Sequence, residues 1–140
     1  MQSRPEQPPV NDSRLSLLLT SLVDRVADLR HAIVLSEDGL VISRSTSLDR
    51  TGSERLAATA SALMSLGSAI CADAGGGGVL QVLIEMRDGF LVLTSAGRGT
   101  HLAVLAASKA DIGVVAFEMN MLVKKIGAHL GAAPRIEPAS

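Results

Sequence analysis

The side chains in this sequence that could do chemistry are three histidines and one cysteine. His31, His101 and His129 lie far apart, and none has a cysteine or carboxylate at metal-ligand spacing. His101 follows a turn at the start of an expected strand, so we interpret it as structural unless a remote residue joins it in the fold. Cys71 has no neighbouring His or Lys to activate its thiol, which indicates an inert core residue. The sequence predicts no catalytic residue and no metal ligand.

The glycine run Gly75–Gly78 is a further candidate, because glycine-rich loops can hold phosphate. A P-loop ends in Lys-Ser or Lys-Thr and leads into a helix, whereas here Val79 and Leu80 begin an expected strand. We therefore interpret the glycines as the end of a helix followed by a chain reversal. No Gly-x-Ser-x-Gly elbow occurs, and the Asp-Gly pairs at 38–39 and 88–89 are typical of turns. We expect no enzyme activity and no cofactor-binding residue.

Composition excludes further classes of partner. The 140 residues include 13 Lys and Arg against 14 Asp and Glu, which gives no basic footprint for nucleic acid. Trp and Tyr are absent and only two Phe are present, so almost no ring is available to stack on a base or sugar. A single cysteine excludes an intramolecular disulfide and indicates a reducing compartment. We expect a cytoplasmic protein, with any recruitment to a membrane being peripheral and through partners.

Hydrophobic periodicity indicates one domain, expected over residues 13–131. The flanking segments 1–12 and 132–140 are rich in Pro, Ser and Ala, and we expect flexible tails there. Residues 1–9 carry charge and prolines before any apolar run, unlike a signal peptide. Apolar residues spaced by three and four predict helices over 14–28 and 112–130.

The remaining elements are one more helix and five short strands. Thr51 and Glu54 have the spacing of a capping box that opens the middle helix, and Asp111 can cap the last one. The order is α-β-β-α-β-β-β-α, with short turns that make neighbouring strands antiparallel. We expect an α/β domain of the α+β sandwich type, with about five strands in a mainly antiparallel sheet and helices on both faces. The expected strands are 32–35, 40–43, 79–86, 90–96 and 100–107.

The middle helix is unusual because residues 56–72 contain no charged side chain. Helical geometry gathers its large residues on one side, which we expect to face the sheet. These large residues are Leu56, Leu63, Leu66 and Ile70, flanked by Met64 and Cys71. The opposite arc contains only small residues: Ala57, Ala58, Ser61, Ala62, Ser65, Ser68, Ala69 and Ala72.

Three interpretations of this helix compete. A membrane span needs about 20 mainly apolar residues, and this stretch is shorter, carries Thr59 and several serines, and ends at Asp73. Alternatively, Ala and Ser are good helix formers that fill a partly exposed helix. We favour the third interpretation, in which the large face packs on the sheet and the small face packs against a second copy of the chain. We therefore expect no membrane span.

The strand expected over 79–86 supports a homodimer. As the first strand of a meander it is expected at a sheet edge, and it contains no Pro or Lys to protect that edge. Pairing of two such edges across a two-fold axis would cover the strand and the small-faced helix together.

The same segments carry a family resemblance. Between the first helix and the Ala/Ser-rich helix stands AIVLSEDGLVISRS (32–45), and after the glycines come VLQVLIEM (79–86) and DGFLVLTSAG (88–97). THLAVLAAS (100–108) and IGVVAFEMNMLVKKI (112–126) complete the order. This sequence of pieces resembles the roadblock/dynein light chain family, in particular its bacterial, actinobacterial-like members.

The resemblance implies a profilin-like roadblock fold and a homodimer joined by the second helix and third strand. It also implies a non-catalytic regulator of a Ras-like small GTPase in a bacterial signalling system, with a sensor-kinase-like protein as a further partner. Two alternatives stay open: a scaffold without effect on GTP turnover, and a small-molecule sensor, which would need a cavity with polar anchors.

The interface implied by the resemblance can be placed on this chain residue by residue. Arg55 and Asp73 flank the middle helix and are candidates for orienting a partner. The expected interface residues are Ala58, Ser61, Ala62, Ser65, Ala69, Ala72, Val79, Gln81 and Leu83.

Overall fold

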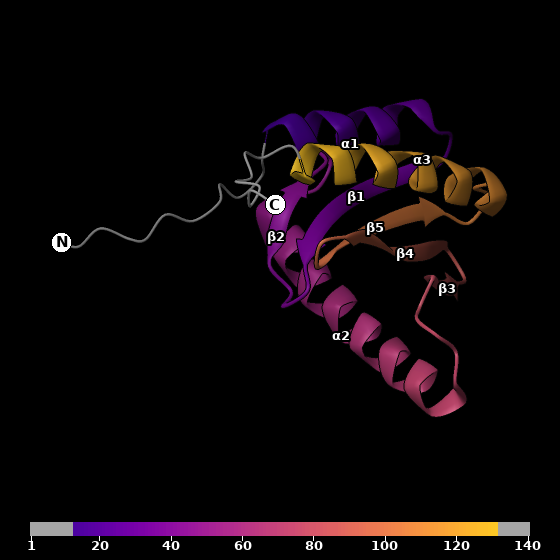
Figure 1. Cartoon of the computed structure of the whole chain (residues 1–140). Coiled ribbons are helices and arrows are strands. Elements are labelled where there is room, and N and C mark those ends of the chain that lie inside the picture. Colours follow the sequence, from indigo (N-terminus) through magenta and orange to yellow (C-terminus); the bar gives the residue numbers. More distant parts are fainter. Residues whose placement is uncertain (1–12, 132–140) are drawn as a thin grey trace, which may run out of the picture.

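Three helices and five strands make up the computed structural model, which describes residues 13–131 (Figure 1). The expected tails, 1–12 and 132–140, lie outside the described residues. The predicted order of elements is confirmed. The elements are α1 (Ser13–Arg25), β1 (Leu29–Ser36), β2 (Val41–Arg44), α2 (Arg50–Ala74), β3 (Gln81–Met86), β4 (Gly89–Gly97), β5 (Thr100–Ala107) and α3 (Ile112–Gly131).

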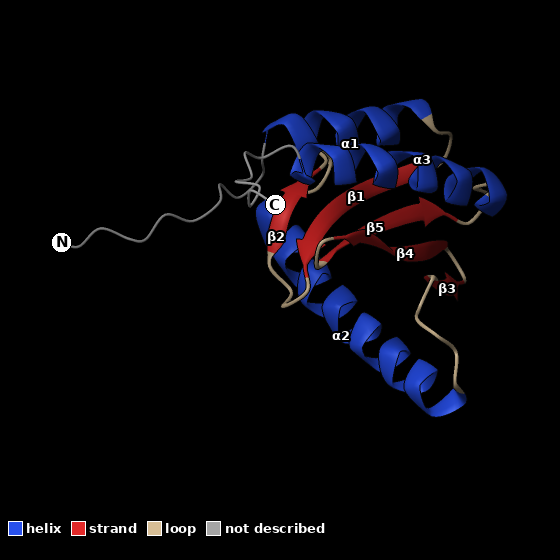
Figure 2. Ribbon diagram, viewed as in Figure 1, coloured by secondary structure: helices blue, strands red, loops and turns tan. Residues whose placement is uncertain are grey.

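The five strands form one sheet in the order β2-β1-β5-β4-β3, and every neighbouring pair is antiparallel. Helices α1 and α3 lie side by side on one face of this sheet and α2 covers the other, as Figure 2 shows. An ion pair of 2.7 Å between Arg25 on α1 and Glu118 on α3 links the two helices of the first layer. β3 pairs only with β4, so the prediction that this strand lies at a sheet edge is confirmed.

Two hydrophobic cores result, one on each face of the sheet. Successive residues of a strand point to opposite faces, so on β1 Ala32 and Val34 face α1 and α3, whereas Ile33 and Leu35 face α2. The core under α1 and α3 is the larger one and contains long side chains from both helices. The core under α2 receives mainly small residues from that helix, which lets the helix lie close to the strands.

Several element boundaries differ from the predictions. The first helix ends at Arg25 because Asp28 adopts a left-handed backbone conformation, with φ 70°, that turns the chain into β1. The third strand begins at Gln81 instead of Val79, because pairing with β4 starts at Gln81 opposite Thr94. Gly77 and Gly78, with φ angles of 81° and 139°, turn the chain before it. Gly75 ends α2 with a φ of 68°, which confirms that the glycine run stops a helix.

The N-terminus of α2 is capped by Asp49, whose carboxylate accepts a hydrogen bond of 2.8 Å from the Gly52 N–H. The capping box predicted at Thr51 is therefore wrong, because the helix already begins at Arg50. Glu54 pairs instead with Arg50 on the exposed helix surface, at 3.1 Å.

Removing this cap is expected to destabilise the domain. Asp49→Ala leaves the Gly52 N–H without its acceptor and should lower the free energy of unfolding by about 1 kcal/mol. Urea denaturation followed by circular dichroism measures the change. Asp49→Asn, which retains a capping oxygen, is the matched control, and equal losses in the two variants would contradict the assignment of the cap.

Candidate protein-interaction surface

Helix α2 contacts the sheet through a strip of mainly small residues. Ser53, Ala57, Ala60 and Met64 are buried, and Leu56 and Leu63 pack partly buried along the same strip. The prediction that Ala57 faces away from the sheet is therefore wrong. Two alanines at the contact let the helix backbone approach the strands closely, while the leucines fill the space at its margins.

Leu66 and Ile70, which were expected to face the sheet, are 62% and 67% exposed. The physical reason is the rotation of the helix about its axis: at 100° per residue Leu66 lies about 180° and Ile70 about 140° from the buried Ala57. Figure 1 shows that the C-terminal half of α2 projects away from the sheet. In this half Gly67 lies against Val79 of the linker and Val82 of β3, but no strand lies under Leu66 or Ile70.

The outward arc of α2 matches most of the predicted interface. Its exposed small residues are Ala58, Ala62, Ser65, Ala69 and Ala72, with Arg55 and Asp73 exposed towards its two ends. Ser61 is half-buried at the margin of this arc, and its hydroxyl donates a hydrogen bond of 2.8 Å to the Glu37 carbonyl. Ser61 therefore holds the β1–β2 hairpin against the helix.

The predicted positions around β3 are divided between the two sides of the sheet. Val79 is half-buried and packs with the α2 core. Gln81 and Leu83 are exposed and pair with Thr94 and Val92, on the α1 and α3 side. Val79 lies before the strand, which begins at Gln81, so the alternation of β3 does not extend back to Val79.

Apolar side chains add to this region beyond what the sequence predicted. Leu66, Ile70, Leu80 and Met86 are all exposed large hydrophobic residues on α2, on the linker or on β3, and exposed apolar patches of this kind mark interaction sites. The absence of charged residues from 56 to 72 was the sequence signal that could have located Leu66 and Ile70. We define the α2–β3 surface by these residues: Ala58, Ala62, Ser65, Leu66, Ala69, Ile70, Ala72, Leu80, Gln81, Leu83 and Met86.

By length and composition, α2 is the one helix among residues 13–131 that is long and apolar enough to cross a membrane. Helices packed in the core of soluble proteins also have such lengths and compositions. Ala57 and Ala60 are fully buried against the strands, so a spanning arrangement would have to break the second core. The absence of a membrane span stays a prediction.

The residues considered for chemistry lie in separate places. Within the described part of the chain no three His, Cys, Asp or Glu side chains come together as a metal site would require. Cys71 is half-buried near the end of α2. The His31 Nδ1 lies 2.9 Å from the Ser47 hydroxyl, and the buried His101 Nδ1 has no hydrogen-bond partner.

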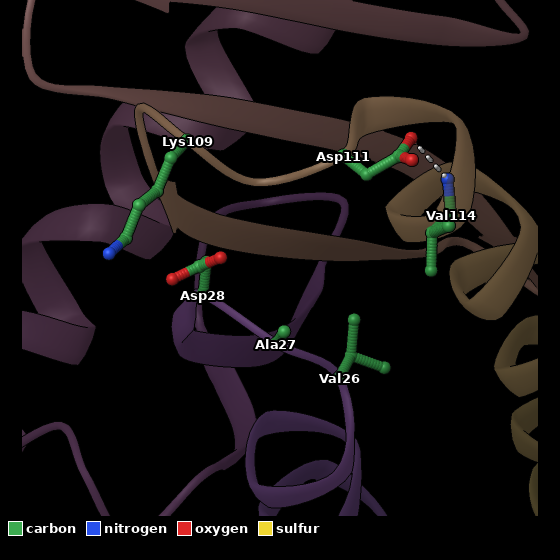
Figure 3. A pocket seen from close by; sticks show the side chains of 6 residues that line it. All are labelled: Val26, Ala27, Asp28, Lys109, Asp111 and Val114. Carbon is green, nitrogen blue, oxygen red and sulfur yellow. Dashed lines mark hydrogen bonds between the residues drawn. The ribbon is translucent and has the colours of Figure 1, made fainter.

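A cavity of about 180 Å³ lies where α1 ends and α3 begins (Figure 3). Its charged side chains are Asp28, Lys109 and Asp111, and the Asp111 carboxylate accepts a hydrogen bond of 3.2 Å from the Val114 N–H. Asp111 therefore caps α3, as predicted. At this volume the cavity is smaller than the roughly 300–1,000 Å³ typical of small-molecule sites, so it is not the cavity that the sensor interpretation requires.

His101 is expected to make stability depend on pH. Burial lowers the pKa of His101 below its ordinary value of 6.5, and the negative charge of Glu37 opposes this only in part. The unfolded chain then takes up the proton more readily than the folded one, so stability falls as the pH drops below about 6.5. Between about pH 7 and pH 5 the melting temperature should therefore fall less in His101→Gln than in the unchanged chain, as measured by circular dichroism. An equal loss in both proteins would contradict this role of His101.

Comparison with known proteins agrees with this architecture. Residues 15–106 match the model of the Roadblock/LC7 domain family, and the chain belongs to this family. A Roadblock/LC7 domain structure from Streptomyces avermitilis is 42% identical, with a TM-score of 0.80 over 84% of this chain and 98% of the other. A second Roadblock/LC7 domain structure from that organism is 58% identical, with a TM-score of 0.68 over 81% of this chain and 99% of the other.

A more distant relative shows the fold alone. Myxococcus xanthus MglB is 12% identical and has a TM-score of 0.79 over 86% of this chain and 98% of its own. Comparison with curated protein sequences gives no match.

Proposed function

We propose that this chain forms a homodimer through the α2–β3 surface and, as a dimer, binds and regulates a Ras-like small GTPase in a bacterial signalling system. It acts without catalytic residues of its own. A sensor-kinase-like protein is a further proposed partner, and the proposed location is the cytoplasm, with peripheral recruitment to membranes through partners.

The proposed homodimer is supported chiefly by the exposed, uncharged arc of α2, which lies beside an unprotected sheet edge. No charged residue occurs from 56 to 72, and Leu66 and Ile70 face solvent in a single copy. Small side chains on the arc let a second helix approach closely, and the flanking large ones would then be covered. The α2 and β3 elements contact each other, so one two-fold axis can bring both into the same interface.

The proposal that the partner is a GTPase is supported by the family to which the chain belongs. The chain belongs to the Roadblock/LC7 domain family, and the resemblance found in its sequence implies regulators of Ras-like GTPases. Arg55 and Asp73 stand towards the two ends of the exposed α2 arc, where charges at the rim of an interface set the orientation and rate of docking. Regulation requires that the dimer bind one nucleotide state of the GTPase more tightly than the other.

The experiment measures GTP hydrolysis and release of a fluorescent GDP analogue by a candidate GTPase, with and without this protein in excess. We expect at least a several-fold change in one of the two rates. Binding without any change in either rate, and with equal affinity for both nucleotide states, would contradict regulation and favour the scaffold. Absence of binding would contradict the choice of GTPase.

A further inference from the structure

Helix α3 carries large apolar side chains on the side that faces away from the sheet. Val114, Phe117 and Met121 are 47%, 61% and 42% exposed, and their spacing of three and four residues places them on one line along the helix. The opposite side of the helix is buried through Val115, Met119, Leu122 and Ile126. The three exposed residues, here called the α3 stripe, therefore contribute little to the core of a single copy.

The proposed dimer leaves the α3 stripe uncovered. α3 lies with α1 on one face of the sheet, and α2 lies on the other (Figure 1). The α2–β3 surface lies on α2, the linker and the edge strand β3, and none of its residues belongs to α3. Leu17 on α1 and Leu40 in the β1–β2 hairpin are also exposed, whereas Val114, Phe117 and Met121 form a line of three on α3, and such apolar patches mark interaction sites.

Charges at the two ends of the α3 stripe have opposite sign. Beyond Val114, the cavity at the start of α3 holds Asp28, Asp111 and Lys109, two negative charges against one positive (Figure 3). Beyond Met121, the exposed residues Lys124 and Lys125 supply positive charge alone. A partner that fits the α3 stripe must therefore offer apolar side chains with positive charge at one end and negative charge at the other.

A second copy of the same helix meets this requirement. We propose that the α3 stripe packs against the α3 stripe of another copy, with the two helices antiparallel across a two-fold axis beside Phe117. An axis midway between positions 117 and 118 places Val114 opposite Met121 of the other copy. The same axis brings Asp111 nearly level with Lys125 of the other copy, on the same side of the helix pair, so the apolar and the charged pairs come into register together. A parallel arrangement would instead bring lysine to lysine.

The other occupants fit less well. The segments outside the described residues contain only Met1, Val10 and Ile136 as large apolar residues, which is too few to cover the α3 stripe. From Val114 to Met121 the stripe extends for about 10 Å, so the buried area falls below that of stable interfaces. The contact is therefore weak, and it joins two dimers into four chains only at high protein concentration. The α3 contact itself goes beyond the proposed function, and only its assembly of two dimers into four chains rests on the proposed homodimer.

Sedimentation velocity of the full chain, from about 5 µM to about 500 µM, tests the contact. We expect the average mass to rise towards twice its low-concentration value. Phe117→Asp should abolish this rise without lowering the mass at low concentration. Asp111→Asn keeps the helix cap but removes the charge, and should move the midpoint several-fold higher in concentration.

Controls separate this contact from the α2–β3 surface. Asn120→Asp makes a similar change at an exposed position of α3 outside the α3 stripe, and should behave like the unchanged chain. Ser65→Glu, which is directed at the α2–β3 surface, should still double its mass at high concentration. A constant mass across the whole series, or a rise that Phe117→Asp leaves intact, would overturn the proposal. Circular dichroism melts at low concentration establish that each variant is folded.

Discussion

Ser65→Glu is expected to convert the proposed dimer into single chains at micromolar concentration. Ser65 is exposed in the middle of the uncharged arc of α2, with Ala62 and Ala69 one turn away on either side. In a close-packed pair of helices the new carboxylate loses its water and gains no partner, which costs several kcal/mol. Size-exclusion chromatography with light scattering should show the mass falling from twice 14.5 kDa to 14.5 kDa.

The matched control is Ser21→Glu. Ser21 is also exposed on a helix, but it lies on α1, across the sheet from α2. The dimer should be unchanged in this variant. If Ser65→Glu were to keep the mass of two chains, the small-residue arc of α2 would not be the contact, and the proposed interface would have to be abandoned.

Leu93→Ala is expected to cause the largest loss of stability. Leu93 is fully buried in the core under α2, on a strand whose neighbours at this level are Val82 of β3 and Ala103 of β5. Truncation removes apolar contacts and leaves a cavity between three strands and a helix, which costs about 3 kcal/mol. The melting temperature should fall by on the order of 10 °C.

Leu17→Ala provides the comparison, because Leu17 is 72% exposed on α1. The same atoms are removed there without opening a cavity, so the free energy of unfolding should change by less than about 0.5 kcal/mol. Both variants must be melted at one protein concentration, since the proposed dimer would add to the apparent stability. Similar losses in the two proteins would contradict the assignment of Leu93 to the second core.

The order of elements could be predicted because each is encoded locally. The turns at Asp38-Gly39 and Asp88-Gly89 separate apolar runs of strand length, and Gly39 adopts the positive φ expected of such a turn, 87°. The long helices could be predicted from apolar residues at intervals of three and four. Antiparallel pairing of β1 with β2, and of β4 with β3 and β5, then follows from the short connections. The pairing of β1 with β5 joins strands that no short turn connects, and the sequence did not predict it.

The orientation of α2 could not be predicted from its own residues. Both arcs of this helix are uncharged, so the sequence lacks the polar face that normally marks the side turned to water. The structure selects Ala57 and Ala60 for the sheet, because close approach of the backbone to the strands outweighs the size of individual side chains. The exposure of Leu66 and Ile70 follows from this choice, because both residues lie far around the helix from Ala57.

The α3 stripe was also hidden in the sequence. The apolar periodicity of α3 separates Val115, which is buried, from Val114, which is exposed, but large apolar residues on the second side give no sign of whether another element covers them. Only the positions of α1 and the sheet show which side of α3 remains uncovered.

The hydrogen bond from Ser61 to the Glu37 carbonyl has a consequence for the motion of α2. Glu37 also donates its N–H to the Gly99 carbonyl, at 2.8 Å, so the first half of the helix is fastened through the hairpin to a second turn of the domain. Among the described residues of α2 beyond Gly67, no side chain makes such a hydrogen bond to another element. Amide protons there should therefore exchange with deuterated water well before those near Ala60. Mass spectrometry of the exchanged peptides would measure this difference in exchange rate along α2. Binding of a partner to residues 68–74 would reduce the difference.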